Sequence, residues 1–564
     1  MNNSSLWIIL QRMRLPFTVI VITYTISITG LVIIPGVDND GNPYNLSIFD
    51  AFYFTSYMAT TIGFGESPYD FTYAQKIWVS ISIYLTVLGW FYGIGTLVSL
   101  LQDKLFLSEI AIVRFKRAVK NIKEDFVIIL GYNDTTSEII TKMLEKKIRV
   151  VVIEQEQKKA DYLMLEGFVP NVPVLVGDVE NIKSLEYAGI YSKHCKAIIS
   201  LFQTNILNLR VTLSSKLLNQ AVKVAIKSTT TNDTLNLLDA GADIVENPYS
   251  IITYQIQMGL NSPSLFKLEN WLYQIDTLES KKFSIPKENI IVCGYGRLGK
   301  LLDAMFKNNN IIPTIIEQNE EIYTKAKKND LIENIILGNA EDKYILKQAN
   351  IQTAKLIIVA TENDTINLSI VSTIKKLNKK IFIISRENQI SNLSIFTYAN
   401  IDHIFLPSKI IIHKSINAIV NPLNDRLIRI LTQKDEHWGR ALLARLLKKI
   451  HNNPITFELE ITKKDAPEIY NYLKLENKTI SLDTIKRSRR DRHQFNNIIT
   501  LLIVRGNKDI LLPEQTTKLK INDKILFACD NNAKDDLEYI ANNIYELYYI
   551  LGYNKEKGFM GLFK

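Results

Sequence analysis

Two long stretches without a formal charge lie near the start of this 564-residue chain. Residues 15–34 and 77–101 each supply the run of about 20 apolar positions with which a helix crosses a bilayer. The alternatives are a signal peptide for the first stretch and a buried core helix for the second. The first is too long for the apolar part of a signal peptide and lacks an A-x-A cleavage pattern. Because a second such stretch follows closely, two membrane-spanning helices are the better interpretation.

Charged residues around these stretches predict their orientation. Arg12 and Arg14 precede the first, and residues 36–75 between the two contain acidic residues but no Lys or Arg. Several basic residues follow the second stretch: Lys104, Arg114, Lys116, Arg117, Lys120 and Lys123. Since positive flanks stay inside, we expect a multi-pass protein with both termini cytoplasmic and residues 36–75 facing outward.

The segment between the predicted spans joins an aromatic stretch to a glycine-containing one. Residues 49–59 are long enough for a helix that crosses half a bilayer, and Thr61, Ile62, Gly63, Phe64 and Gly65 follow them. This pattern, with Glu66 behind it, resembles the selectivity filter of potassium channels. Such a filter replaces the water around K⁺ with rings of backbone carbonyls, and glycine permits the backbone conformations that this requires.

The filter-like segment departs from the family pattern T-V-G-Y-G at two positions. Ile62 replaces Val, and Phe64 replaces Tyr and so lacks a hydroxyl that could tie the filter to its surroundings. In the second span, the resemblance favours Gly89 or Gly93 as a gating hinge, because glycine weakens a helix locally. Close helix packing is the alternative role for both glycines.

From residue 125 onward the chain is a tandem duplication. Short β-branched runs alternate with helical stretches, which predicts α/β domains with parallel sheets. Five matching segments recur at offsets of 159 to 163 residues, among them 126–132 with 289–296 and 202–211 with 361–371. A repeat of this length indicates two copies of one domain.

The second copy contains a dinucleotide-type turn in its expected context. Gly294, Gly296 and Gly299 follow a predicted strand and open a predicted helix, whose N-terminus can meet phosphate. Glu317 ends the next strand and suits a ribose hydroxyl pair, which favours NAD(H) or an adenine nucleotide over NADP. The first copy keeps only Gly131 of this pattern, together with Glu154, and is expected to bind nucleotide poorly or not at all. An empty Rossmann-like scaffold is the alternative for both copies.

Nearly the whole chain resembles a prokaryotic two-transmembrane potassium channel with tandem RCK (TrkA-N and TrkA-C type) domains. The resemblance implies a homotetramer in a bacterial or archaeal plasma membrane, with a cytoplasmic gating ring that binds nucleotides or ions. It also implies the nucleotide-binding residues, and Asn339 stands where the family often has Asp. These residues are Gly294, Gly296, Arg297, Leu298, Gly299, Glu317, Asn339, Ala340, Thr361 and Arg386.

The predicted fold is a membrane α-helical pore, with two spans and a pore helix, joined to cytoplasmic α/β Rossmann-like RCK domains and an α+β C-terminal lobe. The expected boundaries are 1–101 for the pore, 102–124 for a helical linker, 125–280 for the first RCK domain, 281–430 for the second Rossmann-like lobe and 431–564 for the C-terminal lobe. In the C-terminal lobe, the basic run 487–492 is typical of a solvated loop, and an anion-binding site is the more specific alternative. The six His have no metal-ligand spacing, whereas a Ca²⁺ site of scattered carboxylates needs no local motif.

The leading functional hypothesis is passive K⁺ conduction gated by an NAD- or ADP-type nucleotide, with Ca²⁺ as a further candidate ligand and no catalytic residue. The expected partners are other copies of the chain, the bilayer and the nucleotide. The net charge of +9 is a weak argument for nucleic acid, which is not expected. One alternative is a membrane-tethered NAD-dependent oxidoreductase, for which His403 and Lys409 are the nearby acid/base candidates. The other is a regulatory subunit of a separate K⁺ transporter, against which the chain's own filter argues.

Overall fold

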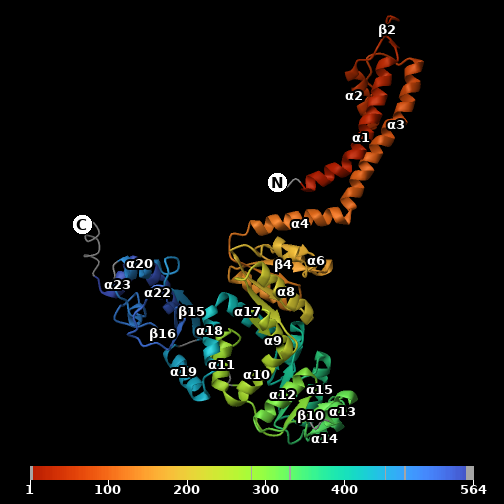
Figure 1. Cartoon of the computed structure of the whole chain (residues 1–564). Coiled ribbons are helices and arrows are strands. Elements are labelled where there is room, and N and C mark those ends of the chain that lie inside the picture. Colours follow the sequence, from red (N-terminus) through yellow and green to blue (C-terminus); the bar gives the residue numbers. More distant parts are fainter. Residues whose placement is uncertain (1–3, 281–282, 329–331, 451–452, 476–477, 554–564) are drawn as a thin grey trace. The chain divides into compact units, whose positions relative to one another are not determined.

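The computed structural model describes residues 4–280, 283–328, 332–450, 453–475 and 478–553 (Figure 1). They form two compact units, Met1–Asn121 and Ile122–Lys564.

The first unit is an antiparallel arrangement of two long apolar helices with a short helix beside them. The segments Met13–Ile33 of α1 and Tyr73–Ser99 of α3 are long and apolar enough to cross a membrane. The indole Nε1 of Trp78 donates to the carbonyl of Ser27 (3.0 Å), which ties α3 to α1. The elements of this unit are α1 (Ser4–Ile33), β1 (Gly36–Val37), β2 (Pro43–Tyr44), α2 (Ile48–Ala59), α3 (Tyr73–Gln102) and α4 (Lys104–Lys120).

The second unit contains two six-stranded parallel sheets with the same strand order. The first sheet runs β5-β4-β3-β6-β7-β8 and the second β11-β10-β9-β12-β13-β14, so the predicted Rossmann-like α/β fold is confirmed. Their central strands are β-branched and buried on both faces, as parallel strands covered by helices are. The strands are β3 (Phe126–Leu130), β4 (Arg149–Glu154), β5 (Val174–Val176), β6 (Cys195–Ser200), β7 (Lys223–Lys227), β8 (Ile244–Glu246), β9 (Ile290–Cys293), β10 (Thr314–Glu317), β11 (Ile335–Leu337), β12 (Leu356–Val359), β13 (Phe382–Arg386) and β14 (His403–Phe405).

Helices connect the strands on both faces of each sheet. In the first copy they are α5 (Asp134–Glu145), α6 (Gln157–Leu165), α7 (Ile182–Tyr187), α8 (Asn205–Leu218), α9 (Thr231–Asp239), α10 (Pro248–Asn261) and α11 (Pro263–Leu272). In the second copy they are α12 (Arg297–Asn308), α13 (Glu320–Lys328), α14 (Lys343–Gln348), α15 (Asp364–Leu377), α16 (Leu393–Tyr398), α17 (Pro407–Val420) and α18 (Pro422–Leu431).

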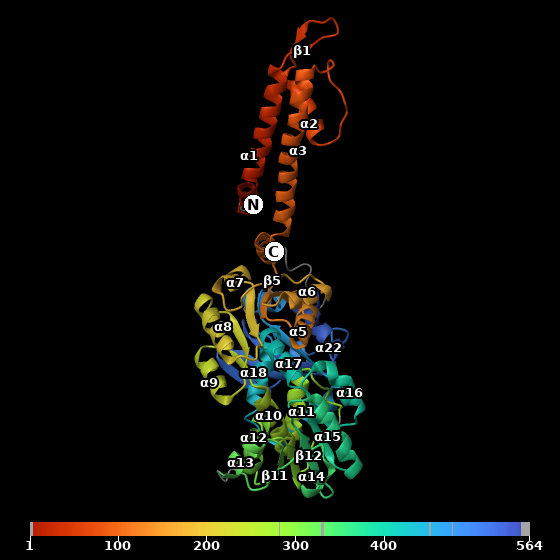
Figure 2. The ribbon, with the colours of Figure 1, turned by 90° about the vertical axis from the view of Figure 1, so that its right-hand side faces the viewer.

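The two copies exchange the helix that follows their last strand. Helix α10 leaves the first sheet and packs against α12, where Ile252 and Ile256 join the core of the second sheet. Helix α17 leaves the second sheet and packs against α5, where Ile411 and Ile412 join the core of the first (Figure 2). Each sheet therefore completes its apolar core with a helix encoded by the other copy.

A smaller antiparallel sheet, in the order β15-β18-β16-β17, completes the second unit. One of its faces packs on α11, α18 and α19, through Trp271, Leu427 and Leu446 among others. This matches the predicted α+β lobe. Its elements are α19 (Glu436–Lys449), β15 (Ile455–Glu460), α20 (Pro467–Leu475), α21 (Leu482–Ile485), β16 (Ile498–Arg505), β17 (Lys508–Leu511), β18 (Lys524–Cys529), α22 (Asn531–Asn542) and α23 (Ile544–Leu551).

The helix exchange predicts where a cavity in α17 should be felt. Ile412 is fully buried, so Ile412→Ala should cost about 2–5 kcal/mol of unfolding free energy. In hydrogen-exchange mass spectrometry the loss of protection should fall mainly on β3, β4 and β6 of the first sheet. The control Ile206→Ala, at a residue that is 81% exposed on α8, should change little. Loss of protection confined to the second sheet would contradict the exchange.

Candidate functional site

The filter-like loop leaves α2 in an alternating backbone conformation. Thr61, Gly63 and Gly65 have φ angles of 62°, 65° and 75°, whereas Ile62 and Phe64 between them have none in this region. Such alternation turns successive carbonyls toward one side, which is the requirement that the sequence predicted for this segment. Among the described residues, no hydrogen bond is accepted by a carbonyl of positions 61–65.

Hydrogen bonds with residues in the last turns of α2 hold the loop in place. The carbonyl of Tyr57 accepts hydrogen bonds from the N–H groups of Ile62 (3.0 Å) and Gly63 (3.3 Å). The Tyr57 hydroxyl donates to the carbonyl of Glu66 (2.7 Å), and the Tyr53 hydroxyl donates to the Glu66 carboxylate (2.9 Å). Two tyrosines of α2 thus supply the anchoring that Phe64 cannot. The sequence contains them four residues apart, which places them on one helix face, but their partner was not predicted.

The glycines of α3 lie against α1. A Cβ added to Gly89 would lie 2.9 Å from Thr23 Oγ1, and one added to Gly93 would lie 2.8 Å from Ile20 Cδ1. Helix α3 is continuous through both positions. This geometry favours close packing for the two glycines, and a hinge role remains a prediction.

The second copy forms a cavity of about 300 Å³ at the carboxyl ends of its strands. Nine of the ten predicted nucleotide-binding residues line it: Gly294, Gly296, Arg297, Leu298, Glu317, Asn339, Ala340, Thr361 and Arg386. Gly299 does not line it, because it serves packing: a Cβ there would collide with the Gly294 carbonyl. Gly294 has φ 99°, and a Cβ at Gly296 would meet nothing within 4 Å.

The helix that opens from this turn is uncapped. Gly296 is the N-cap of α12 and provides no side-chain hydrogen bond, so the first N–H groups of the helix are available to an anion. In the first copy the same position is Asn133, whose Oδ1 accepts from Thr136 N (3.0 Å) while Thr136 Oγ1 accepts from Asn133 N (2.8 Å). The first copy therefore fills with its own side chains the place that the second copy leaves open.

The Glu317 carboxylate is buried and already holds two backbone groups. It accepts from Tyr295 N (2.6 Å) and Asn319 N (2.7 Å). In the first copy Glu154 makes the matching bonds, to Tyr132 N and Glu156 N. These bonds have a structural role that both copies share, so a ribose would have to use the remaining lone pairs of Glu317.

Asn339 and Thr361, which also line the cavity, already have hydrogen-bond partners within the protein. Asn339 Oδ1 accepts from Glu341 N (2.9 Å), and Thr361 Oγ1 donates to Asn367 Oδ1 (2.6 Å). A ligand that binds here would share these groups with the fold or displace their partners.

Two residues at the cavity edge, Glu362 and Tyr249, were not predicted. Arg297 pairs with the carboxylate of Glu362 (2.7 Å), and this pairing lowers the pKa of Glu362. The guanidinium groups of Arg297 and Arg386 lie 4.6 and 5.1 Å from the ring centre of Tyr249. Tyr249 belongs to α10, so the first copy contributes a side chain to the edge of the second copy's cavity. No local motif could reveal it, because the contact depends on the helix exchange.

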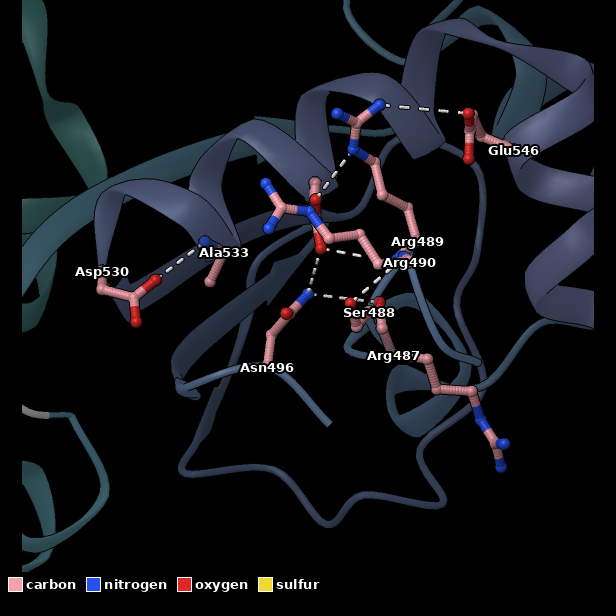
Figure 3. A network of polar contacts seen from close by, with 9 residues as sticks. Arg487, Ser488, Arg489, Arg490, Asn496, Asp530, Ala533 and Glu546 are labelled. Carbon is pink, nitrogen blue, oxygen red and sulfur yellow. Dashed lines mark hydrogen bonds and ion pairs between the residues drawn. The ribbon is translucent and has the colours of Figure 1, made fainter. Parts of the chain in front are cut away.

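The basic run 487–492 is largely engaged within its own lobe (Figure 3). Arg489 Nε donates to Asp536 Oδ1 (3.1 Å), and its guanidinium lies 4.3 Å from the ring centre of Tyr539. Asn496 binds the other oxygen of the same carboxylate (3.1 Å). Arg489 thus has a packing role that was not predicted from the sequence, and the anion site stays a prediction.

His403, one of the two acid/base candidates of the oxidoreductase alternative, is engaged in packing. The His403 imidazole lies 4.0 Å from the ring centre of Phe283 and 4.5 Å from that of Phe405. Burial lowers the pKa of His403 to about 4. Within the described ranges, no three His, Cys, Asp or Glu side chains are grouped so as to hold a metal ion.

The comparisons agree with this architecture. The TrkA-N domain model matches residues 127–248 and 290–407. Potassium channel protein 1 of Methanocaldococcus jannaschii is 28% identical over 254 residues, which cover 45% of this chain and 66% of that protein. Probable potassium channel protein 2 of the same organism is 31% identical over 160 residues, covering 28% of this chain and 43% of that protein. The solved GsuK channel matches 95% of this chain and 99% of its own at 15% identity, with a TM-score of 0.47.

The alignments thus span two thirds or less of the curated relatives' own lengths, and the two matched segments coincide with the two parallel sheets. The chain is similar in sequence to the potassium channel proteins of Methanocaldococcus jannaschii, and the TrkA-N domain model matches it twice in tandem.

Proposed function

We propose that the chain is the subunit of a potassium-selective channel whose pore is gated by a nucleotide bound to the second TrkA-N domain. The observation that supports it most is the loop 61–65, with its alternating positive φ angles and unused carbonyls, between two helices of membrane-spanning length. Conduction through it is passive and requires no catalytic residue. The names of the homologous proteins agree with this proposal.

A pore of this kind needs several copies of the chain. One chain supplies a single strand of carbonyls, whereas a dehydrated K⁺ must be surrounded. A homotetramer around one axis meets this requirement. The positive flanks of the spans favour a multi-pass topology with both termini cytoplasmic.

The second TrkA-N domain is the better candidate for the gating site. Its helix α12 has free first-turn N–H groups and two arginines nearby, which suits the phosphates of an ADP- or NAD-type ligand. The Glu317 carboxylate disfavours a 2′-phosphate, as expected for an adenine nucleotide that is not NADP. A ligand changes the open probability only if it binds the open and closed states with different affinity.

The conduction proposal can be tested with the full chain in liposomes. We expect K⁺ flux that excludes Na⁺, is blocked by Ba²⁺ and changes with ADP or NAD⁺. Tyr53→Phe removes the hydrogen bond to Glu66 at a cost of about 1–2 kcal/mol to the filter surround. It should lower the K⁺/Na⁺ flux ratio, whereas Tyr84→Phe, at an exposed tyrosine of α3, should not. Absence of K⁺-selective flux under every ligand condition would refute the proposal.

The nucleotide site can be tested at the N-cap of α12. Gly296→Asp fits sterically and caps the helix, but it places a negative charge where phosphate would bind. ADP affinity, measured by calorimetry on the full chain, should fall at least about tenfold, while thermal stability is kept. Gly296→Asn, which copies Asn133 of the first copy, should give a smaller loss. Full retention of the nucleotide response in Gly296→Asp would defeat the site.

The pair of Arg297 and Glu362 predicts a gain of affinity. In the ligand-free chain Glu362 occupies the guanidinium that a phosphate would bind. Because the pair is partly exposed, it contributes about 0.2–1 kcal/mol, so Glu362→Gln should tighten ADP binding by a factor of about 1.5–5. Glu333→Gln, the same charge change at an exposed position before β11, is the matched control. Weaker binding in Glu362→Gln would mean that Glu362 contributes to the ligand contact itself.

A further inference from the structure

A second cavity, of about 440 Å³, lies between the strand ends of the two copies. The first copy contributes Asn133, Asp134 and Lys227 to its lining, and the second contributes Glu387 and Ser408. Of the residues around the first cavity, only Arg386 also lines this one. The volume is in the range of small-molecule sites, about 300–1,000 Å³.

The duplication is not symmetric at this cavity. Pro248 and Tyr249 open α10, and Pro407 and Ser408 open α17 at the equivalent positions, 159 residues later. Tyr249 and Ser408 both line this cavity. The Tyr249 ring lies against the guanidinium groups of Arg297 and Arg386, whereas the equivalent Ser408 has only a small hydroxyl side chain.

Several buried polar atoms at the cavity have no partner. Glu387 is 0% exposed, and neither of its carboxylate oxygens makes a hydrogen bond within the described residues. Ser408 Oγ and Arg386 Nε are likewise buried and unpartnered. Buried polar groups are nearly always satisfied in native proteins, and an unpaired carboxylate is costly. An occupant that offers both acceptors and a donor would satisfy this set.

One end of the cavity favours an anion. Helix α17 has Leu406 as its N-cap and no side-chain cap, whereas Asn247 caps α10 by accepting from Tyr249 N and Ser250 N. The free first turn of α17 therefore faces the cavity together with Lys227. Burial, with repulsion from Arg386 and Arg297, lowers the pKa of Lys227 to about 8, and the charge of a bound anion would favour the protonated amine.

The other end favours a hydrogen-bond donor. Burial, with the nearby Asp364 as a second cause, raises the pKa of Glu387 to about 7. No cationic side chain pairs with it within the described residues. A hydroxyl or amino group on the ligand would satisfy this carboxylate.

The wall that carries Glu387 is rigid before any ligand binds. The Asp364 carboxylate accepts hydrogen bonds from Asn388 N (2.8 Å), Asn388 Nδ2 (2.7 Å) and Gln389 N (3.1 Å). It also accepts one from Asn392 Nδ2 (2.8 Å). Little ordering is therefore needed on binding, which favours affinity.

We propose that this cavity is a second effector site, distinct from the nucleotide site, for a small organic anion that also carries a hydroxyl or amino group. The anionic group binds at the N-terminus of α17 and Lys227, and the donor binds the Glu387 carboxylate and Ser408. The proposal does not depend on nucleotide binding, because its ligand and its test are separate.

The test is calorimetry on the full chain in nanodiscs with matched pairs of acids. Each pair differs in the donor: lactate with propionate, malate and aspartate with succinate, and glycerol 3-phosphate with propyl phosphate. At least one donor-bearing member should bind at least about tenfold more tightly than its counterpart. Binding of none of them, or equal binding within every pair, overturns the proposal and leaves water as the occupant.

Variants locate the binding. Ser408→Tyr gives α17 the side chain of its counterpart in α10, so it should fill the cavity and abolish acid binding while ADP affinity stays within about twofold. Glu387→Gln should reduce the preference for the donor-bearing acid. If Ser408→Tyr lowers the unfolding temperature, Lys227→Met carries the test, with Lys158→Met at an exposed position of α6 as the control. Unchanged acid binding in Glu387→Gln and Lys227→Met would place the site elsewhere and refute the assignment.

Discussion

The reciprocal exchange of α10 and α17 is the constraint on which the cytoplasmic unit depends. Ile252 and Ile256 of the first copy complete the core of the second sheet, and Ile411 and Ile412 of the second complete the core of the first. Neither sheet can bury its apolar face without a helix from the other copy, so the tandem copies fold as one body. The same exchange brings Tyr249 and Ser408 to the lining of one cavity and places the Tyr249 ring against Arg297 and Arg386 beside the other. Both cavities therefore owe part of their chemistry to a copy other than the one whose turn they adjoin.

Helix capping distinguishes the two copies as candidate phosphate-binding sites more clearly than the glycine pattern alone. The glycine pattern predicted a weak first site because the first copy keeps only Gly131 of it. In the structure the side chains of Asn133 and Thr136 each accept a hydrogen bond from the other residue's backbone N–H at the start of α5. Backbone N–H groups that could bind an anion are therefore already occupied. Gly296 leaves α12 without such bonds. Two substitutions in a duplicated turn, at the positions of Asn133 and Thr136, thus separate a closed structural helix end from an open one.

Local patterns predicted the elements whose causes are local. The two apolar stretches, the β-branched strands and the turn at 294–299 depend on residues close in sequence, and the structure places them as expected. The residues that were missed act across long separations: Tyr249 on Arg297, Glu362 on the same arginine, and Tyr53 on Glu66. The surroundings of buried side chains could not be predicted either. Only the folded chain shows that Glu317 accepts hydrogen bonds from two backbone N–H groups and that His403 packs between phenylalanines.

In the proposed channel, the arginines beside Tyr249 are one place at which a bound ligand would act on the first copy. A phosphate that takes Arg297 from Glu362 changes the charge balance around a ring that α10 contributes, and α10 continues directly from the last strand of the first copy. Such a contact would couple a ligand of the second copy to α10 of the first copy through a single residue pair, without a series of intervening side chains. It produces gating only if the position of α10 differs between the open and closed states, because a ligand that contacts both equally shifts nothing. The second cavity is lined by the first residues of both α10 and α17, so a ligand there would contact both exchanged helices.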